Sequence, residues 1–209
     1  MNFKRDKRRI REQIWNRMKK EGIAPPSRPV FERIPSFVGM DKAAENLRKL
    51  GVYKKANVIF VNPDTPQRKV RENALKDGKI VIMPTPRLKQ NFFLLLDPED
   101  VKGMERQAST IKGAFKYGKR IKIEDLPNID LKVQGSVGVA SDGTRLGKGG
   151  GYGDKEFAML KMTGKINEKT PLVTTVHEVQ IVEKIPRESH DIIVDYIVTP
   201  ENIIKTDKS

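Results

Sequence analysis

The sequence predicts an α/β protein built around a mostly parallel sheet. Short apolar runs, typical of buried strands, alternate with longer amphipathic runs, typical of helices. The segments that join them are short, and strands and helices that alternate at such spacing form parallel sheets with right-handed crossovers. The 209 residues suffice for one sizeable hydrophobic core. We therefore expect a single domain over residues 1–209.

The first expected element is a basic amphipathic helix over residues 4–21. Ile10, Ile14 and Met18 recur every four positions, as residues on the buried face of a helix do. Three prolines in the following segment, "GIAPPSRP", end the helix because proline cannot continue it. We expect residues 1–38 to form a helical arm that packs on the rest of the domain.

Helices and strands alternate in the next part of the chain. Asp41 is placed to cap a helix that ends at Gly51. Pro66 in a first turn and Gly78 at an end are typical of the boundaries of a second helix. The elements expected in this part are a helix over 41–50, a strand over 56–62, a helix over 64–79, and strands over 79–84 and 91–97.

Three further β-rich runs follow, which makes about six strands in all. The first of them leads directly into a glycine-rich segment. Trp15, Phe92 and Phe93 stand within apolar periodicities, so we expect them in the core rather than on a surface that stacks nucleobases. The three runs cover residues 129–140, 170–182 and 192–199.

The charge balance favours a polyanionic partner. Lys and Arg number 41 against 27 Asp and Glu, which gives a formal net charge of +14. Such a surplus attracts nucleotides, nucleic acids and polycarboxylates, so weak binding of nucleic acid is one expectation. A charged surface of the kind found in heat-resistant proteins explains the same numbers equally well.

The composition excludes several classes of protein. The chain has no cysteine and two histidines, which excludes disulfides, thiolate catalysis and metal sites rich in cysteine or histidine. No apolar run approaches the roughly 18 residues that a membrane span needs, and the N-terminus lacks the apolar stretch of a secretory signal. We expect a cytoplasmic enzyme or binding protein without a membrane partner, and the oligomeric state stays open.

The segment "SDGTRLGKGGGYGDKEFAML", residues 141–160, carries the strongest functional signal. Its glycines let backbone amides approach an anion, and a helix that opens near Tyr152 directs its positive end at the same place. Arg145 and Lys148 add positive charge, and the carboxylate of Asp154 suits Mg²⁺ bound to phosphate oxygens. The pattern predicts a site for a triphosphate with its metal ion. It is neither a P-loop nor a dinucleotide fingerprint, and from the glycines alone a flexible loop is the alternative.

The same string resembles the signature of the 5-formyltetrahydrofolate cyclo-ligase (methenyltetrahydrofolate synthetase) family, Arg-Leu-Gly-x-Gly-x-Gly-Tyr-Tyr-Asp. "KRRIR" at 7–11 and "HDIIVDYIVTP" at 190–200 resemble two more motifs of that family, in the same order along the chain. "RPVFERIPSF" and "NPDTPQRKVRE" are similar to the methenyltetrahydrofolate synthetase domain-containing branch. Animal members of that branch add an RNA-recognition module, which we expect this chain to lack.

The resemblance implies a fold, a reaction and its ligands. The fold is a three-layer α/β sandwich similar to the NagB/RpiA/CoA transferase group. The reaction uses ATP and Mg²⁺ to close 5-formyltetrahydrofolate, or a related formyl-pterin, to the 5,10-methenyl form. The formyl oxygen attacks the γ-phosphate, and the neighbouring amine then displaces the phosphate. Phosphoryl transfer depends on positioning and charge neutralisation, so the scarcity of histidine does not oppose this reaction.

Carried over by position, the resemblance assigns roles to residues of three segments. The ATP site would consist of Lys7, Arg8, Arg11, Arg145, Gly147, Lys148, Gly149, Gly150, Gly151, Tyr152 and Gly153. The substrate would contact Arg11, Lys148, Gly149, Gly150, Gly151 and Tyr152. Arg145, Lys148 and Tyr152 would be catalytic, and Asp154 and Asp191 would bind Mg²⁺, with Asp195 on the same face of a strand in support.

Two positions depart from the family pattern. Gly153 replaces the second Tyr of Tyr-Tyr-Asp, and Pro66 stands where a simple offset places the family's folate-binding glutamate, for which Glu72 is a substitute only at a different offset. Arg87 is a candidate for contacting substrate carboxylates, and His190 is expected to be a structural neighbour of the site. The alternative function is therefore a nucleotide-binding or RNA-associated homologue that has lost folate chemistry.

Overall fold

The computed structural model describes residues 3–85, 92–189 and 191–207. Its centre is an eight-stranded sheet with the order β11-β10-β8-β5-β1-β2-β3-β4. The strands of this sheet are β1 (Val58–Val61), β2 (Ile80–Pro84), β3 (Phe93–Leu96), β4 (Lys119–Ile121), β5 (Leu131–Gly135), β8 (Leu172–Thr175), β10 (Tyr196–Val198) and β11 (Ile203–Lys205). The five strands from β10 to β2 pair in parallel, whereas β11, β3 and β4 join antiparallel at the edges. The predicted mostly parallel sheet is confirmed.

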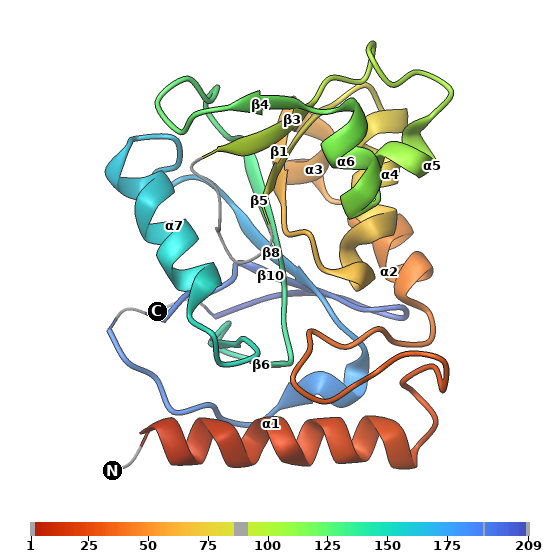
Figure 1. Cartoon of the computed structure of the whole chain (residues 1–209). Coiled ribbons are helices and arrows are strands. Elements are labelled where there is room, and N and C mark those ends of the chain that lie inside the picture. The colour runs from red at the N-terminus through yellow and green to blue at the C-terminus, as the bar shows by residue number, and fades with distance from the viewer. Residues whose placement is uncertain (1–2, 86–91, 190, 208–209) are drawn as a thin grey trace.

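Helices cover both faces of this sheet, which gives the three layers that the resemblance implied (Figure 1). The helix α7 (Tyr152–Met162) lies on one face. On the other face lie α2 (Met40–Leu47), α3 (Gly51–Lys55), α4 (Arg68–Lys76), α5 (Glu105–Ala108) and α6 (Ile111–Tyr117). None of the described helices is long and apolar enough to span a membrane.

The alternation of side chains along β1 explains why both faces need a cover. Ile59 and Val61 point into the core shared with α2 to α6, whereas Val58 and Phe60 point into the core shared with α7. All four are buried, as the continuous apolar run "VIFV" predicts for a central parallel strand. Burial of such side chains contributes about 1.5–3 kcal/mol each, so this layer is a main source of stability.

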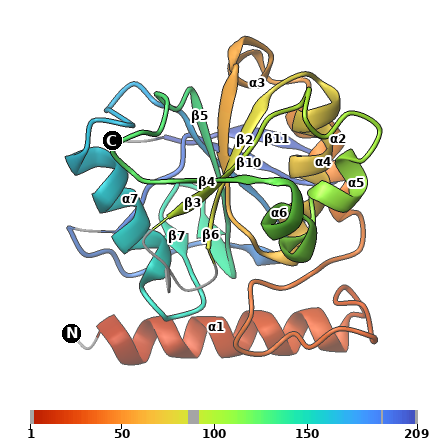
Figure 2. The ribbon, with the colours of Figure 1, turned by 45° about the horizontal axis from the view of Figure 1, so that its top comes forward.

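The N-terminal helix α1 (Phe3–Lys20) lies across one end of the molecule (Figures 1 and 2). Ile14, Trp15 and Met18 form its buried face, which packs against Phe37 and Val137 among others. Beside α1 lies a second sheet of three short strands, in which β6 (Gly138–Ala140) pairs with β7 (Arg145–Leu146) and with β9 (Ile181–Val182). The helix expected over 4–21 is α1, whereas residues 21–38 contain no helix.

Several predicted boundaries were wrong. The run 129–140 is two strands, β5 and β6, that belong to different sheets, and 170–182 holds β8, the 3-10 turn η3 (Glu178–Gln180) and β9. In the run 192–199 only β10 is a strand of the sheet. The chain forms eleven strands in its described part rather than about six, because two predicted runs hold two strands each and the short strands β4, β7 and β11 were not predicted.

The helix ends also differ in detail. Asp41 does not cap α2, since that helix begins at Met40 after Gly39, whose φ of 82° is left-handed. Gly51 begins α3 instead of ending α2. The predicted helix over 64–79 starts as a 3-10 turn, η1 (Thr65–Gln67), and continues as α4, with Gly78 in the left-handed region just beyond its end.

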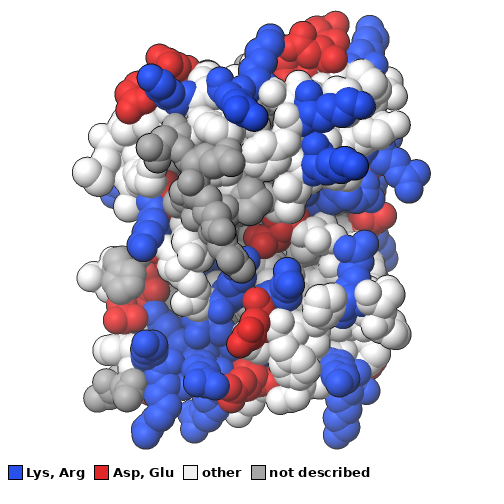
Figure 3. All heavy atoms as spheres, viewed as in Figure 1, with Lys and Arg blue, Asp and Glu red and all other residues white. Residues whose placement is uncertain are grey.

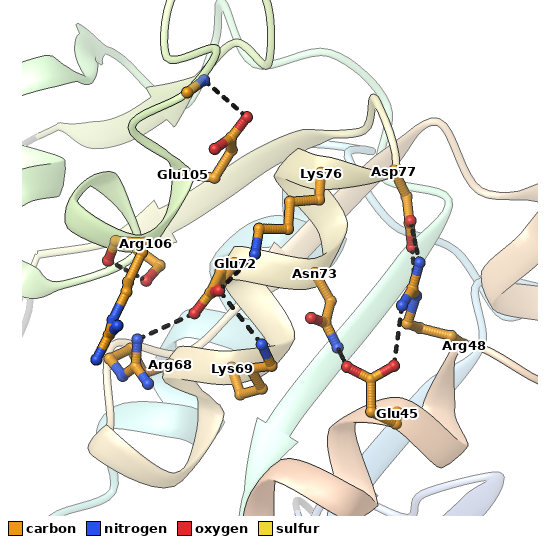
Figure 4. Close-up of polar contacts among 12 residues, drawn as sticks. Glu45, Arg48, Arg68, Lys69, Glu72, Asn73, Lys76, Asp77, Glu105 and Arg106 are labelled. Atoms are coloured by element: carbon orange, nitrogen blue, oxygen red, sulfur yellow. Dashed lines mark hydrogen bonds and ion pairs between the residues drawn. The ribbon is translucent and has the colours of Figure 1, made fainter.

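A carboxylate on α4 gathers three cations (Figure 4). Glu72 is 3% exposed and accepts hydrogen bonds from Lys76 Nζ at 2.8 Å, Lys69 Nζ at 3.2 Å and Arg68 Nη1 at 3.1 Å. Burial alone would raise the pKa of Glu72, but the hydrogen bonds from Lys76 and Lys69 outweigh it and lower the pKa. Glu72 therefore stabilises α4 in its charged form.

The lowered pKa of Glu72 predicts a defined dependence of stability on pH. A carboxyl group whose pKa is lower in the folded state contributes fully above its unfolded value of about 4.3, and the contribution is lost as the pH falls through the folded value. We expect Glu72→Gln to unfold at a lower urea concentration than the parent at pH 7. The difference between the two unfolding midpoints should be smaller at pH 3. A difference that stays the same at both pH values would contradict this assignment.

Candidate functional site

A cavity of about 1110 Å³ opens where β1 and β2 end. Parallel sheets bind ligands at the carboxyl ends of their strands, because loops of different strands meet there. The walls come from the segments after β1 and β2, from α1, from the segment before Phe37, from the loop between β7 and α7, and from Glu188 and Asp191. Segments far apart in the sequence thus enclose one space.

The glycine loop, residues 147–151, forms one wall of the cavity. Gly149 and Gly151 have φ of 101° and 66°, a region that side chains rarely adopt. Gly151 is the N-cap of α7, which confirms the predicted helix start at Tyr152. Among the described residues, none accepts a hydrogen bond from the backbone amides of residues 147–154. A row of unpaired amides at the start of an 11-residue helix suits an anion.

Arg145 supports this loop from below. Its Nε donates to the carbonyl oxygen of Gly135 at 2.9 Å, and its Nη1 lies 3.7 Å from Oδ1 of Asp154. The side chain is 8% exposed, and burial lowers the pKa of Arg145, an effect that Asp154 opposes. Arg145 therefore presents a fixed positive charge at the base of the loop, next to the carboxylate of Asp154.

Arg11 joins α1 to the same loop. Its Nε donates to the carbonyl oxygen of Gly147 at 2.6 Å, and burial lowers the pKa of Arg11, with the charge of Arg145 acting in the same direction. Lys148 projects further into solvent and lies 3.6 Å from Oδ1 of Asp64, which follows β1. The structure thus brings Arg11, Arg145 and Lys148 around one loop, as the sequence predicted.

Lys7 and Asp191 lie in direct contact. Nζ of Lys7 donates to both carboxylate oxygens of Asp191, at 2.6 and 2.8 Å, and to Oε2 of Glu188 at 2.9 Å. Burial alone would lower the pKa of Lys7, but the two carboxylates outweigh it and raise the pKa. Arg8, in contrast, has a side chain that is 79% exposed and pairs with Glu12 on the same helix. Lys7 therefore links α1 to the segment 188–191 through two ion pairs.

The carboxylates fit Mg²⁺ unequally. The described residues hold no group of three or more metal-ligating side chains, but Mg²⁺ is usually held by one or two carboxylates together with substrate phosphates. Asp154 fits this role, since its side chain is 32% exposed and borders the cavity beside the free amides. Asp191 fits less well, because Lys7 and the amide of Glu188 already occupy its oxygens.

The floor of the cavity contains polar residues that were not predicted. Asn62 and Glu156 line the cavity, and Glu156 forms an ion pair with Lys132 on β5. Burial raises the pKa of Glu156 and lowers that of Lys132, while their mutual attraction acts in the opposite direction on each. The signal in the sequence was the string "LKVQG", which places a Lys and a Gln on one face of an otherwise apolar strand.

The structure shows the surroundings of the two positions, Gly153 and Pro66, that depart from the family pattern. A Cβ at Gly153 would lie 2.4 Å from Nε2 of Gln134, so the space next to the backbone is already occupied by a buried amide. Pro66 is buried in η1. Glu72 is paired with cations on α4 and does not border the cavity, so it does not supply the missing carboxylate.

Other predicted residues have structural roles. Asp195 accepts from the amide of Leu172 and is not in a strand with Asp191, so these two carboxylates do not share a strand face. Trp15 and Phe93 are buried, as predicted, and Phe92 packs at the edge of the core. Arg87 and His190 lie outside the described residues. The last of the predicted site residues, Tyr152, is 37% exposed at the mouth of the glycine loop.

Basic side chains gather over the N-terminal half of α1, at the lower left of the space-filling view (Figure 3). This part of α1 contains Lys4, Arg5, Lys7, Arg8, Arg9 and Arg11. The helix therefore presents positive charge next to the cavity entrance, where it favours the approach of an anionic ligand.

Comparisons with known proteins agree with this geometry. The family model described as the 5-formyltetrahydrofolate cyclo-ligase family matches residues 3–200. Methenyltetrahydrofolate synthase domain-containing proteins of Bos taurus and Homo sapiens are 42% and 40% identical over 205 residues. These matches cover 96% of this chain but 54% and 53% of the relatives, so the chain spans about half of their length.

Two solved structures share the fold. The NMR structure of Aquifex aeolicus 5,10-methenyltetrahydrofolate synthetase matches with a TM-score of 0.60 and 21% identity, over 97% of this chain and 94% of that one. A 5,10-methenyltetrahydrofolate synthetase from Mycoplasma pneumoniae matches with a TM-score of 0.55 and 14% identity, over 97% and 99%. Together with the match over residues 3–200, these findings show that the chain belongs to the 5-formyltetrahydrofolate cyclo-ligase family.

Proposed function

We propose that this protein is an ATP- and Mg²⁺-dependent cyclo-ligase that converts 5-formyltetrahydrofolate, or a related formyl-pterin, to the 5,10-methenyl form. The carrying observation is the glycine loop, which lines the cavity and whose amides have no acceptor among the described residues. Family membership supports the reaction, and the solved structures that share the fold are named as 5,10-methenyltetrahydrofolate synthetases.

The cavity has room for more than one small ligand. Pockets for single small molecules usually measure about 300–1,000 Å³, and this one measures about 1110 Å³. A reaction that transfers a phosphoryl group from a nucleoside triphosphate to a second substrate requires both molecules to lie side by side in one site. The volume therefore supports a two-substrate reaction at this site.

The residues around the loop suit phosphoryl transfer to a formyl oxygen. The amides of residues 147–154 would bind phosphate oxygens, while Arg145 and Lys148 would neutralise the charge that accumulates as the γ-phosphate is transferred. Arg11 would hold the loop in this geometry through Gly147. After the transfer, the neighbouring amine nitrogen attacks the formyl carbon and the phosphate leaves with the formyl oxygen.

Asp154 is the residue that would hold Mg²⁺. The ion, when bound, would offset the negative charge of the phosphate groups. Asp154 has one neighbouring cation, Arg145, at 3.7 Å, and its side chain still reaches the cavity. Arg145 would thus orient the carboxylate toward the loop.

The reaction itself is tested with purified protein, 5-formyltetrahydrofolate and MgATP. We expect the absorbance of the methenyl product to appear together with ADP, and to depend on both substrates. If neither product nor ATP turnover is detected while MgATP still binds, the second candidate function, a nucleotide-binding homologue without folate chemistry, replaces this proposal. RNA binding that weakens steeply with salt would then identify the polyanion that the basic face of α1 attracts.

Asp154→Asn tests the position of the metal. The variant keeps the size of the side chain but loses the charge, so we expect the affinity for MgATP to fall about tenfold or more, since a contact to a charged group is worth on the order of 1.5–3 kcal/mol. Calorimetric titration with MgATP measures this. The matched control is Asp125→Asn, an exposed carboxylate outside the cavity. Equal affinities for the two variants would remove Asp154 from the site.

Lys7→Gln and Arg8→Gln test the ion pairs that link α1 to the segment 188–191. Lys7→Gln leaves two carboxylates without their cation, so we expect a loss of about 3 kcal/mol in the free energy of unfolding and weaker binding of MgATP. Arg8→Gln removes an exposed pair, which is worth about 0–1 kcal/mol. Urea unfolding and MgATP titration of both variants provide the comparison. Similar losses in the two variants would show that Lys7 has no special role.

A further inference from the structure

A cluster of buried polar residues lies directly under the cavity. It consists of Asn62 after β1, Lys132 and Gln134 on β5, and Glu156 on α7, and is called the polar floor below. Leu131 and Val133 of β5 face the helices α2 to α6, so the alternation of the strand directs Lys132 and Gln134 to the opposite face, beneath the first turns of α7. Asn62 and Glu156 border the cavity itself.

The polar floor is deeply buried and incompletely paired. Lys132 is 0%, Gln134 1% and Glu156 2% exposed. Lys132 Nζ donates to Glu156, and Asn62 Nδ2 lies 3.4 Å from both carboxylate oxygens. Within the described part of the chain, both polar atoms of Gln134 and Oδ1 of Asn62 have no hydrogen-bond partner. The large majority of buried side-chain polar atoms are paired in folded proteins, so each exception requires an explanation.

Stability does not explain this arrangement. The surrounding layer is apolar, with Phe60, Ile82 and Leu160 fully buried, and Lys132 lies 4.1 Å from the ring centre of Phe60. A buried ion pair in such a layer is often replaced by apolar residues without loss of stability, because desolvation offsets the attraction between the charges. A ligand whose polar edge supplies the missing hydrogen-bond partners explains why these residues are polar.

The amide of Gln134 packs directly against the backbone of Gly153. A Cβ at this position would lie 2.4 Å from Nε2 of Gln134 and 3.2 Å from Nη1 of Arg145. The first turn of α7 therefore carries no side chain at the point where it crosses Gln134. The same glycine that departs from the family pattern accommodates the buried amide.

The donors and acceptors of the floor select the ligand. The carboxylate of Glu156 and Oδ1 of Asn62 are acceptors that face the cavity, so the ligand must present adjacent N–H donors. The 2-amino-4-oxo pyrimidine edge of a pterin has two such donors side by side, which match a carboxylate in a bidentate pair. The adenine of ATP places a ring nitrogen acceptor next to its amino group, and that acceptor would face a carboxylate without a proton between them.

We propose that Glu156 determines specificity for the pterin ring, by accepting hydrogen bonds from its 2-amino-4-oxo edge, and that Lys132 is the positioning residue that holds Glu156 in place. This inference rests on the proposed function and names the substrate contact that Pro66 and Glu72 do not supply. Asn62, which also borders the cavity, completes the hydrogen bonds of the same edge.

The test is the double variant Lys132→Leu/Glu156→Leu, which removes both charges and leaves neither partner alone. We expect its melting temperature to equal or exceed that of the parent. Titration calorimetry should show that the affinity for 5-formyltetrahydrofolate falls about 10- to 100-fold, as for a lost charge-assisted hydrogen bond to a specific ring, with the affinity for MgATP unchanged. The matched control is Glu72→Gln, a buried carboxylate with cationic partners outside the cavity, which should leave both affinities unchanged.

The outcomes separate this inference from the proposed function. If the double variant binds 5-formyltetrahydrofolate as tightly as the parent, the floor is structural and the inference is overturned while the proposed function stands. If it loses MgATP instead, the floor recognises adenine and the inference is again wrong. If the parent itself binds MgATP but no folate, the proposed function fails and the inference fails with it.

Discussion

The candidate site depends on how two arginines hold a loop that has almost no side chains of its own. The glycine loop can bring its amides close to an anion because it is bare, but a bare loop has nothing with which to anchor itself. Arg145 fixes its base through the carbonyl of Gly135, and Arg11 fixes its outer part through the carbonyl of Gly147. The first bond ties β7, after which the loop begins, to the central sheet, and the second ties the loop to α1, while the amides of the loop have no acceptor among the described residues.

The charges around this loop balance each other without cancelling its attraction for anions. Arg145 lies near Asp154, Lys148 near Asp64, and Lys7 against Asp191 and Glu188. Each cation is thereby oriented, and the unpaired amides remain. The surplus of positive charge on α1 then acts at longer range than any of these contacts.

Most of the fold and much of the site could be predicted from the sequence. Strands such as "VIFV" are continuous apolar runs, and α1 has a regular four-residue apolar repeat, so local pattern and tertiary structure agree. The glycine loop was recognisable because its composition has few structural uses. The edge strands β4 and β11 could not be recognised, because each has three residues of which two are exposed, so neither shows a pattern of buried and exposed side chains.

The parts that sequence could not supply are those that depend on distant pairing. The contact of Lys7 with Asp191 joins positions that are 184 residues apart, and no local rule relates them. Asp195 was expected beside Asp191 because the segment resembles a strand, yet it accepts a hydrogen bond from the amide of Leu172 instead. The Lys132–Glu156 pair is visible in sequence only as an out-of-place lysine, and its partner is known only once α7 lies over β5.

The contact between Lys7 and Asp191 has a consequence for how the protein is made. Lys7 on α1 precedes Glu188 by 181 residues and Asp191 by 184 residues, so α1 is synthesised well before its carboxylate partners. During synthesis α1 therefore lacks these partners, and the cavity is incomplete until Glu188 and Asp191 have emerged from the ribosome. Until those residues have been synthesised, Lys7 has no carboxylate partner and the wall of the cavity that they form is missing.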